Sequence, residues 1–307
     1  MATWNLPGQT KTTWFKSTLA KSFAYSRAFN KRNLEYQWYS LFCQILTDLV
    51  DEFPNIFVVP QFPSWVREED FNALMSQEAP PESGPDGGHV TFVELPNRPH
   101  TRAYVTPAVG QQPMHLLGSQ TEPGEDDQVL DGADASFDSS ATEPAKDAAN
   151  VLIDFALVHV MAEHAIPRHP RYGGWLVTEV NIPVIIEQKR FTSRTLENKA
   201  LHDGIGFLLD IARKDLYEQA AHLFLQFERM ESVIAIATCG PYWSNVILRR
   251  GNVRVEMSLI QDGNWIDAKV NDTLKWPEAV SVEDGTSETR WKQIYKALKA
   301  MPRMELP

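Results

Sequence analysis

Two short apolar runs in the second half of the chain limit most strongly what it can fold into. They span residues 151–158 and 184–190, and both are rich in Val, Ile and Leu. Continuous runs of this kind indicate strands that are buried on both faces of a sheet. Each run nevertheless carries charge: Asp154 in the first, Glu187 and Lys189 in the second. Because Asp and Glu are rarely buried without a cationic partner or a metal ion, these residues need a chemical explanation.

Strand geometry supplies such an explanation. Side chains alternate between the faces of a strand, so Glu187 and Lys189 point the same way and Gln188 points the other way. If Asp154 lies across from Glu187 on a neighbouring strand, about 4.8 Å away, two carboxylates and one ammonium group converge. Hard divalent cations prefer carboxylate, carbonyl and water oxygens. We therefore expect Asp154 and Glu187 to bind Mg²⁺ (or Mn²⁺), with the Gln188 backbone carbonyl as a further ligand. Lys189 would orient an attacking water.

Simpler interpretations exist for each of these residues. Glu187 and Lys189 would form an ion pair if they lay on a solvated edge strand, and Asp154 would then be a residue of a strand-end turn. Glu179 is a rival to Glu187, because residues 177, 179 and 181 also alternate. However, Asn181 cannot supply the cation that Lys189 provides.

Asp154, followed by Glu187-x-Lys189 on a later strand, resembles the motif of the PD-(D/E)XK nuclease superfamily. The resemblance covers roughly residues 30–65 and 150–250. It implies an α/β restriction-endonuclease-like core, in which a mixed central β-sheet is flanked by helices. The expected order is a helix, three strands including the Asp and Glu-x-Lys strands, a helix and another strand. It also implies metal-dependent hydrolysis of phosphodiester bonds in DNA or RNA.

The resemblance adds two candidate site residues. Many members carry a Glu on the first core helix, and Glu35 lies in the first turn of the helix expected at residues 34–52; it would equally complement the helix dipole there. Several branches carry a Gln on the helix after the Glu-x-Lys strand, which Gln219 matches, although Leu223 stands where those branches have Tyr. Ile153 replaces the name-giving Pro.

Composition divides the chain into three parts. Residues 67–148 contain 16 acidic and 4 basic side chains and are rich in Pro, Gly and Ser, whereas the rest contains 24 acidic and 25 basic side chains. Such an acidic segment buries too little apolar surface to offset its ordering entropy, so we expect a largely disordered insertion. Residues 1–66 would supply the N-terminal helices and first strand of the core, and residues 149–307 the remainder, with a C-terminal hairpin and helix. The near-neutral core leaves room for a basic face, so the net charge of −11 does not exclude nucleic acid.

Apolar periodicity predicts the other elements. Helices are expected at 34–52, 196–229 and 288–300, and an amphipathic helix or arm at 11–29. Further strands are expected at 56–60 and 233–238, and a hairpin at 246–255. Pro60 would confine the first strand to an edge of the sheet.

Cationic side chains suggest contacts to nucleic acid in two places. Arg249, Arg250 and Arg254 follow Tyr242 and Trp243, a combination that suits phosphate contact and base stacking. In the loop between the two core strands, phosphate contacts by Arg168 and Arg171 are a better interpretation than a zinc site at His164 and His169, whose spacing lacks a matching second pair.

Other classes of protein have little support. No segment approaches the roughly 20 apolar residues that span a bilayer, and residues 1–16 lack the apolar region of a secretory signal. Cys43 and Cys239 form no metal-ligand pattern. We therefore expect an intracellular protein, cytoplasmic or nuclear, with no membrane partner. Its function is predicted to be that of a nuclease, with a non-catalytic nuclease-fold module that binds nucleic acid or protein as the alternative.

Overall fold

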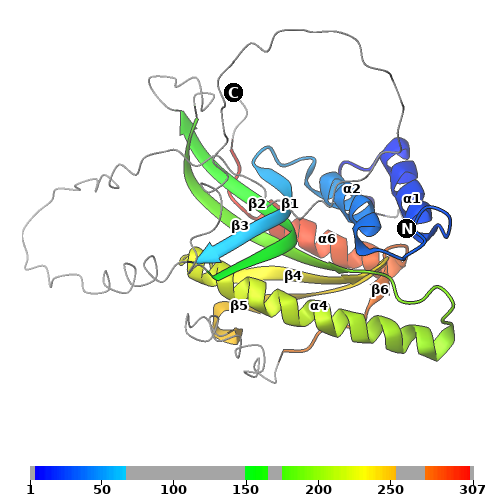
Figure 1. Ribbon diagram of the computed structural model, residues 1–307. Coiled ribbons are helices and arrows are strands. Elements are labelled where there is room, and N and C mark those ends of the chain that lie inside the picture. The colour runs from blue at the N-terminus through cyan, green and yellow to red at the C-terminus, as the bar shows by residue number, and fades with distance from the viewer. Residues whose placement is uncertain (1–3, 67–148, 165–174, 254–273, 305–307) are drawn as a thin grey trace, which may run out of the picture.

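The protein is built on a six-stranded mixed β-sheet with helices on both faces (Figure 1). The computed structural model describes residues 4–66, 149–164, 175–253 and 274–304. The helices are α1 (Lys11–Tyr25), the 3-10 helix η1 (Glu35–Trp38), α2 (Tyr39–Val50), α4 (Asn198–Gln226), the 3-10 helix η4 (Arg250–Asn252) and α6 (Gly285–Lys299). The strands are β1 (Ile56–Val66), β2 (Ala149–His164), β3 (Trp175–Lys189), β4 (Ser232–Cys239), β5 (Tyr242–Arg249) and β6 (Val280–Ser281).

The strands lie in the sheet in the same order as in the chain. β1, β2 and β3 are mutually antiparallel. α4 then crosses over, so that β4 returns parallel to β3, and β5 and β6 add antiparallel neighbours. The predicted α/β class with a mixed central sheet is therefore confirmed. At the end of the β1–β2 pair where the chain passes from one strand to the other, Val66 pairs with Ala149, so residues 67–148 leave and rejoin the sheet at adjacent positions.

The register of β2 against β3 brings the two acidic positions together. Phe155 pairs with Ile186, which makes Asp154 and Glu187 the next residues on the two strands. β3 lies inside the sheet between β2 and β4, so the interpretation of Glu187 as part of a solvated edge strand is wrong. Apolar residues on both sides of Asp154 are buried, as expected for a strand covered on both faces.

β1 is the edge strand that Pro60 predicts, since β2 is its only neighbour among the described strands. The strand nevertheless continues beyond Pro60 to Val66. Its pairing with β2 skips one position, Gln61 opposite Asp154, where Gln61 has a left-handed φ of 50°. An edge strand tolerates both features, because only one side of its backbone must hydrogen-bond to a neighbour.

The two faces of the sheet are covered by different helices. α4 runs across one face (Figure 1). Glu187 and Lys189 point toward this face, because both side chains contact α4. On the other face, Trp243 of β5 stacks on Trp291 of α6 with ring centroids 4.3 Å apart. Figure 1 shows α1 and α2 on the side of α6. α4 thus covers the face that carries the charged residues.

Most predicted elements are present with shifted ends. The helix expected at residues 34–52 begins as the 3-10 helix η1 before α2, and the helix expected at 196–229 is α4. In the hairpin predicted at 246–255, the first arm is the end of β5, and the described residues after it form η4 rather than a tight hairpin turn. The Arg250 guanidinium explains this turn, because it donates to four carbonyls in and beyond the last turn of α4.

Several predictions fall outside the described residues. They are the disorder of residues 67–148, the roles of Arg168, Arg171 and His169, the position of Arg254 and the second arm of the C-terminal hairpin. In the described ranges, no helix is long and apolar enough to cross a membrane.

The turn between β4 and β5 requires glycine. Gly240 has φ +57°, and a Cβ atom at this position would lie 2.7 Å from Cδ2 and 2.8 Å from Cβ of Phe191. Phe191 belongs to the loop that follows β3, and its ring packs against Trp38 and Tyr25. The turn therefore approaches this loop so closely that any side chain would displace it.

We predict that Gly240→Ala lowers the free energy of unfolding by about 1–3 kcal/mol, because alanine disfavours a left-handed backbone and would collide with Phe191. Gly206→Ala is the matched control: it lies inside α4, its added Cβ meets nothing within 4 Å, and better helix propensity should stabilise the protein by up to about 1 kcal/mol. Urea unfolding of both variants tests this pair. Equal midpoints would contradict the packing described here.

Candidate active site

A cluster of charged side chains gathers where β3 ends beneath α4. At its centre, Lys189 Nζ lies 2.6 Å from Glu187 Oε1 and 2.6 Å from Asp215 Oδ2. Glu187 and Lys189 belong to β3, whereas Asp215 belongs to α4. The lysine is therefore a bridge that ties the strand to the crossover helix.

Asp154 lies beside this bridge on β2. Its Oδ2 accepts a hydrogen bond from the Gln188 backbone N–H at 2.7 Å, and its Oδ1 accepts one from the Tyr39 hydroxyl. The Asp154 carboxylate thus accepts the hydrogen bond that the Gln188 amide would otherwise donate to the backbone of a neighbouring strand. Tyr39 also packs its ring against Phe155, with centroids 5.1 Å apart, which holds the start of α2 over the strand.

Glu35 reaches the same region from η1. Its Oε2 accepts a hydrogen bond from the Arg190 backbone N–H at 3.2 Å. The sequence left two roles for Glu35, a helix-dipole partner and a site residue. This contact holds the Glu35 carboxylate at the backbone of the residue that follows Lys189, which supports its role as a site residue.

The two glutamines have different surroundings. Gln219 of α4 donates from Nε2 to Glu187 Oε2 at 2.6 Å and to the Leu152 carbonyl at 3.3 Å, so it joins the cluster as expected. The Gln188 side chain is fully buried and donates to the Lys189 carbonyl at 2.7 Å. Its backbone carbonyl stays a predicted metal ligand.

Burial raises the pKa values of the clustered carboxyls. For Glu187, burial comes first and repulsion from Asp154 second; together they outweigh the attraction of Lys189 and raise its pKa to about 8. Burial likewise raises the pKa of Asp154, although the hydrogen bonds from Tyr39 and the Gln188 amide oppose it. Burial and the nearby Asp154 charge raise the pKa of Glu35. The site therefore holds more acidic groups than its one lysine can neutralise.

Lys189 stays protonated in this setting. Burial by itself lowers its pKa, but the Glu187 and Asp215 carboxylates outweigh that effect and raise the pKa above the ordinary lysine value. The pKa of Tyr39 is raised as well, by burial and then by the Asp154 charge, so its hydroxyl remains a donor. The site thus offers one fixed ammonium and one fixed hydroxyl toward the carboxylates.

The donor set suits a hard divalent cation. Its oxygens come from carboxylates, and the carboxyls with raised pKa values would be stabilised as anions by an added positive charge. Within the described parts of the chain, no three His, Cys, Asp or Glu side chains already stand in an arrangement that would hold a metal ion. Metal binding at this site would therefore require the carboxylates to exchange some of their present partners.

Two members of the cluster were not predicted from the sequence. Tyr39 lies four residues after Glu35, and Asp215 lies four residues before Gln219. Residues four apart share a face of an α-helix, so this spacing makes each a candidate; which polar residue on that face joins the site depends on how the helices pack against the sheet. In contrast, Glu179 is exposed and pairs with Met161 near the hairpin end of β3, away from the cluster.

The residues proposed for base stacking have other partners. Trp243 is buried, and its Nε1 donates to Ser287 Oγ at 2.9 Å. The Arg250 guanidinium is occupied by the carbonyls at the end of α4. Both residues stabilise the fold, so the prediction that Trp243 and Arg250 contact nucleic acid is wrong, whereas Arg254 lies outside the described residues. The exposed Arg249 is the remaining described cation there.

The chain was compared with known proteins at three levels. No family model, no curated protein and no solved structure matches it. The resemblance to the PD-(D/E)XK superfamily therefore depends on the residues of this site and their arrangement.

We predict that the metal-free protein becomes less stable as pH rises from roughly 5 to 8. The ordinary pKa of Glu is 4.5 and that of folded Glu187 is about 8, so the folded state binds the extra proton in this range. The free energy of unfolding should then fall by up to about 1.4 kcal/mol per pH unit from this group. Glu187→Gln should reduce the slope in urea unfolding with EDTA present.

Glu179→Gln is the matched control for this experiment, because Glu179 is an exposed glutamate on the same strand. It should leave the slope unchanged. The same slope in native protein and in Glu187→Gln would show that Glu187 does not take up the proton.

Proposed function

We propose that this protein is a divalent-metal-dependent nuclease with a restriction-endonuclease-like core of the PD-(D/E)XK type. The observation that carries the proposal is the pairing of Asp154 with Glu187-x-Lys189 at one end of an interior strand. Buried carboxylates with raised pKa values, gathered around one lysine, are typical of sites that perform chemistry.

The order of the elements supports the proposed core. A helix precedes three antiparallel strands, and a crossover helix then leads to a parallel strand. This is the order that the resemblance implies. Glu35 and Gln219, the two further residues taken from the resemblance, also contact the region around Glu187 and Lys189. Four separate elements thus contribute side chains in the expected sequence.

Each residue has a proposed role. Asp154 and Glu187 would hold Mg²⁺ or Mn²⁺, with the Gln188 carbonyl as a further ligand, and the bound ion would supply charge stabilisation on a phosphodiester. Lys189 would orient the attacking water, since its ammonium is fixed next to Glu187. Gln219 and Tyr39 would hold the two carboxylates in position. Glu35 would accept a hydrogen bond from the water.

We predict that Asp154→Asn, Glu187→Gln and Lys189→Met each lower the rate of Mg²⁺-dependent cleavage by about 100-fold or more, because each removes a ligand or the water-orienting charge. The assay would follow labelled single- and double-stranded DNA and RNA. Asp210→Asn is the matched control: this aspartate lies on α4, outside the cluster, and its side chain is 66% exposed and pairs with Arg213. Full cleavage by all three site variants would refute the proposed chemistry.

A second function is favoured by one observation. Every carboxylate oxygen of Asp154 and Glu187 already has a donor from the chain itself. A cluster satisfied in this way could serve structure alone, as in a non-catalytic module of the same fold that binds nucleic acid or protein.

Calorimetric titration with Mg²⁺ or Mn²⁺ separates the two functions. The nuclease predicts binding that is lost in both Asp154→Asn and Glu187→Gln. No binding to a folded native chain, together with no cleavage, would favour the non-catalytic module.

A further inference from the structure

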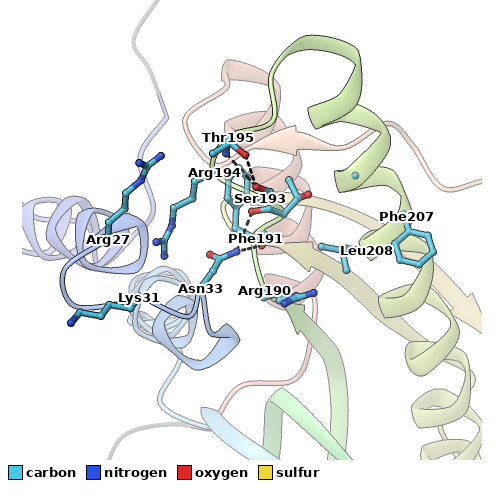
Figure 2. Close-up of a pocket in the computed structure, with 12 residues that line it drawn as sticks. Arg27, Lys31, Asn33, Arg190, Phe191, Ser193, Arg194, Thr195, Phe207 and Leu208 are labelled. Atoms are coloured by element: carbon cyan, nitrogen blue, oxygen red, sulfur yellow. Dashed lines mark hydrogen bonds between the residues drawn. The ribbon is translucent and has the colours of Figure 1, made fainter.

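A cleft with a volume of about 660 Å³ opens beside the carboxylate cluster. It lies between the segment after α1, the loop after β3 and the first turns of α4 (Figure 2). The cleft begins at Arg190, the residue that follows Lys189, and the Arg190 backbone N–H donates to Glu35. The cleft and the cluster therefore share a wall.

The lining of the cleft is cationic. Arg27, Lys31, Arg190 and Arg194 line it, and no Asp or Glu does. Figure 2 shows Arg27, Lys31 and Arg194 gathered on the side of α1, while Arg190 extends toward α4. A concentration of positive charge without acidic neighbours attracts an anion and raises its local concentration.

Three of these cations are available to a ligand. Arg194 has a structural role, because it donates to the carbonyls of Ala24 at 3.1 Å and Asn30 at 2.8 Å. Arg27, Lys31 and Arg190 form no ion pair with any described carboxylate, and all three are exposed. Arg194 thus holds the loop after β3 against the segment after α1, and Arg27, Lys31 and Arg190 can contact a ligand in the cleft.

The cleft is built into the fold. Asn33, which has a left-handed φ of 51°, donates from Nδ2 to the Thr192 carbonyl at 3.1 Å and so joins two walls. On the third wall, a Cβ at Gly204 would lie 2.6 Å from Thr192 Oγ1, so α4 packs closely against the same loop. Phe207 stands at the rim of the cleft on α4 and is 66% exposed. This exposed ring lies on the α4 side of the cleft, across from Arg27 and Lys31 (Figure 2), and offers a surface on which a base can stack.

We propose that this cleft binds a single-stranded polynucleotide and guides it to the carboxylate cluster. Arg27, Lys31 and Arg190 contact its phosphates, and Phe207 stacks on one base. The volume lies within the roughly 300–1,000 Å³ range of pockets that enclose small ligands, which fits a few nucleotides. The bases of a duplex are paired and stacked on one another, so they are not free to stack on Phe207, whereas the unpaired bases of a single strand are. This inference rests on the proposed nuclease and narrows its substrate to single strands.

The test is fluorescence anisotropy with labelled single-stranded DNA, single-stranded RNA and duplex DNA, in EDTA so that binding is measured without cleavage. Arg27→Ala/Lys31→Ala should weaken single-strand binding about tenfold and reduce its dependence on salt, because two phosphate contacts are lost. Phe207→Ala should weaken it about tenfold, and Phe207→Trp should retain it.

Two matched controls exclude general effects of charge and surface. Lys292→Ala/Lys296→Ala removes two exposed cations from α6, and Phe57→Ala removes a ring that is 50% exposed on β1. Both should bind as the native chain does.

Several results would overturn the proposal. They are absence of single-strand binding by the native chain, unchanged binding in both cleft variants, and duplex binding as tight as single-strand binding. Failure of the nuclease is recorded separately, as the lack of metal-dependent cleavage by the native chain. Binding that depends on the cleft without such cleavage would therefore support the cleft and refute the nuclease.

Discussion

The site depends on one ammonium group held between carboxylates from two elements. Lys189 contacts Glu187 on its own strand and Asp215 on α4. Glu187 is buried while Asp215 is 38% exposed on its side chain, so loss of Glu187 would leave the lysine with only its solvated partner. The apolar face of α4 packs on the core, and the Lys189 contact that ties this helix to the end of β3 also sets the charge of the site. Stability and chemistry are coupled here through a single side chain.

Much of the sheet could be predicted from the sequence because its strands are apolar and regular. Residues 151–158 and 184–190 read as buried strands, and both lie inside the sheet. The same period of two placed Glu187 and Lys189 on one face, and the observed register supplies the assumed neighbour by bringing Asp154 beside Glu187. The alternation of side chains along a strand was therefore sufficient to predict which residues share a face of the sheet.

The remainder of the site could not be predicted in this way, because it depends on packing between distant elements. Asp215 is one of several polar residues on α4, and only the crossing of this helix over β3 selects it as the partner of Lys189. Similarly, Arg250 and Trp243 have the composition of a nucleic-acid surface, yet tertiary contacts use both of them inside the fold. The cationic cleft is also assembled from three separate segments, so no single stretch of sequence reveals it.

The pairing of Val66 with Ala149 has a consequence for how the chain can change in length. These two positions are neighbours across an antiparallel ladder, so the two ends of the connecting segment are held side by side whatever its length. The entropic cost of closing such a loop grows only logarithmically, at about 0.6 kcal/mol for each doubling. Evolution can therefore lengthen, shorten or exchange residues 67–148 almost freely, and this junction is a natural place at which to insert a tag or a second domain.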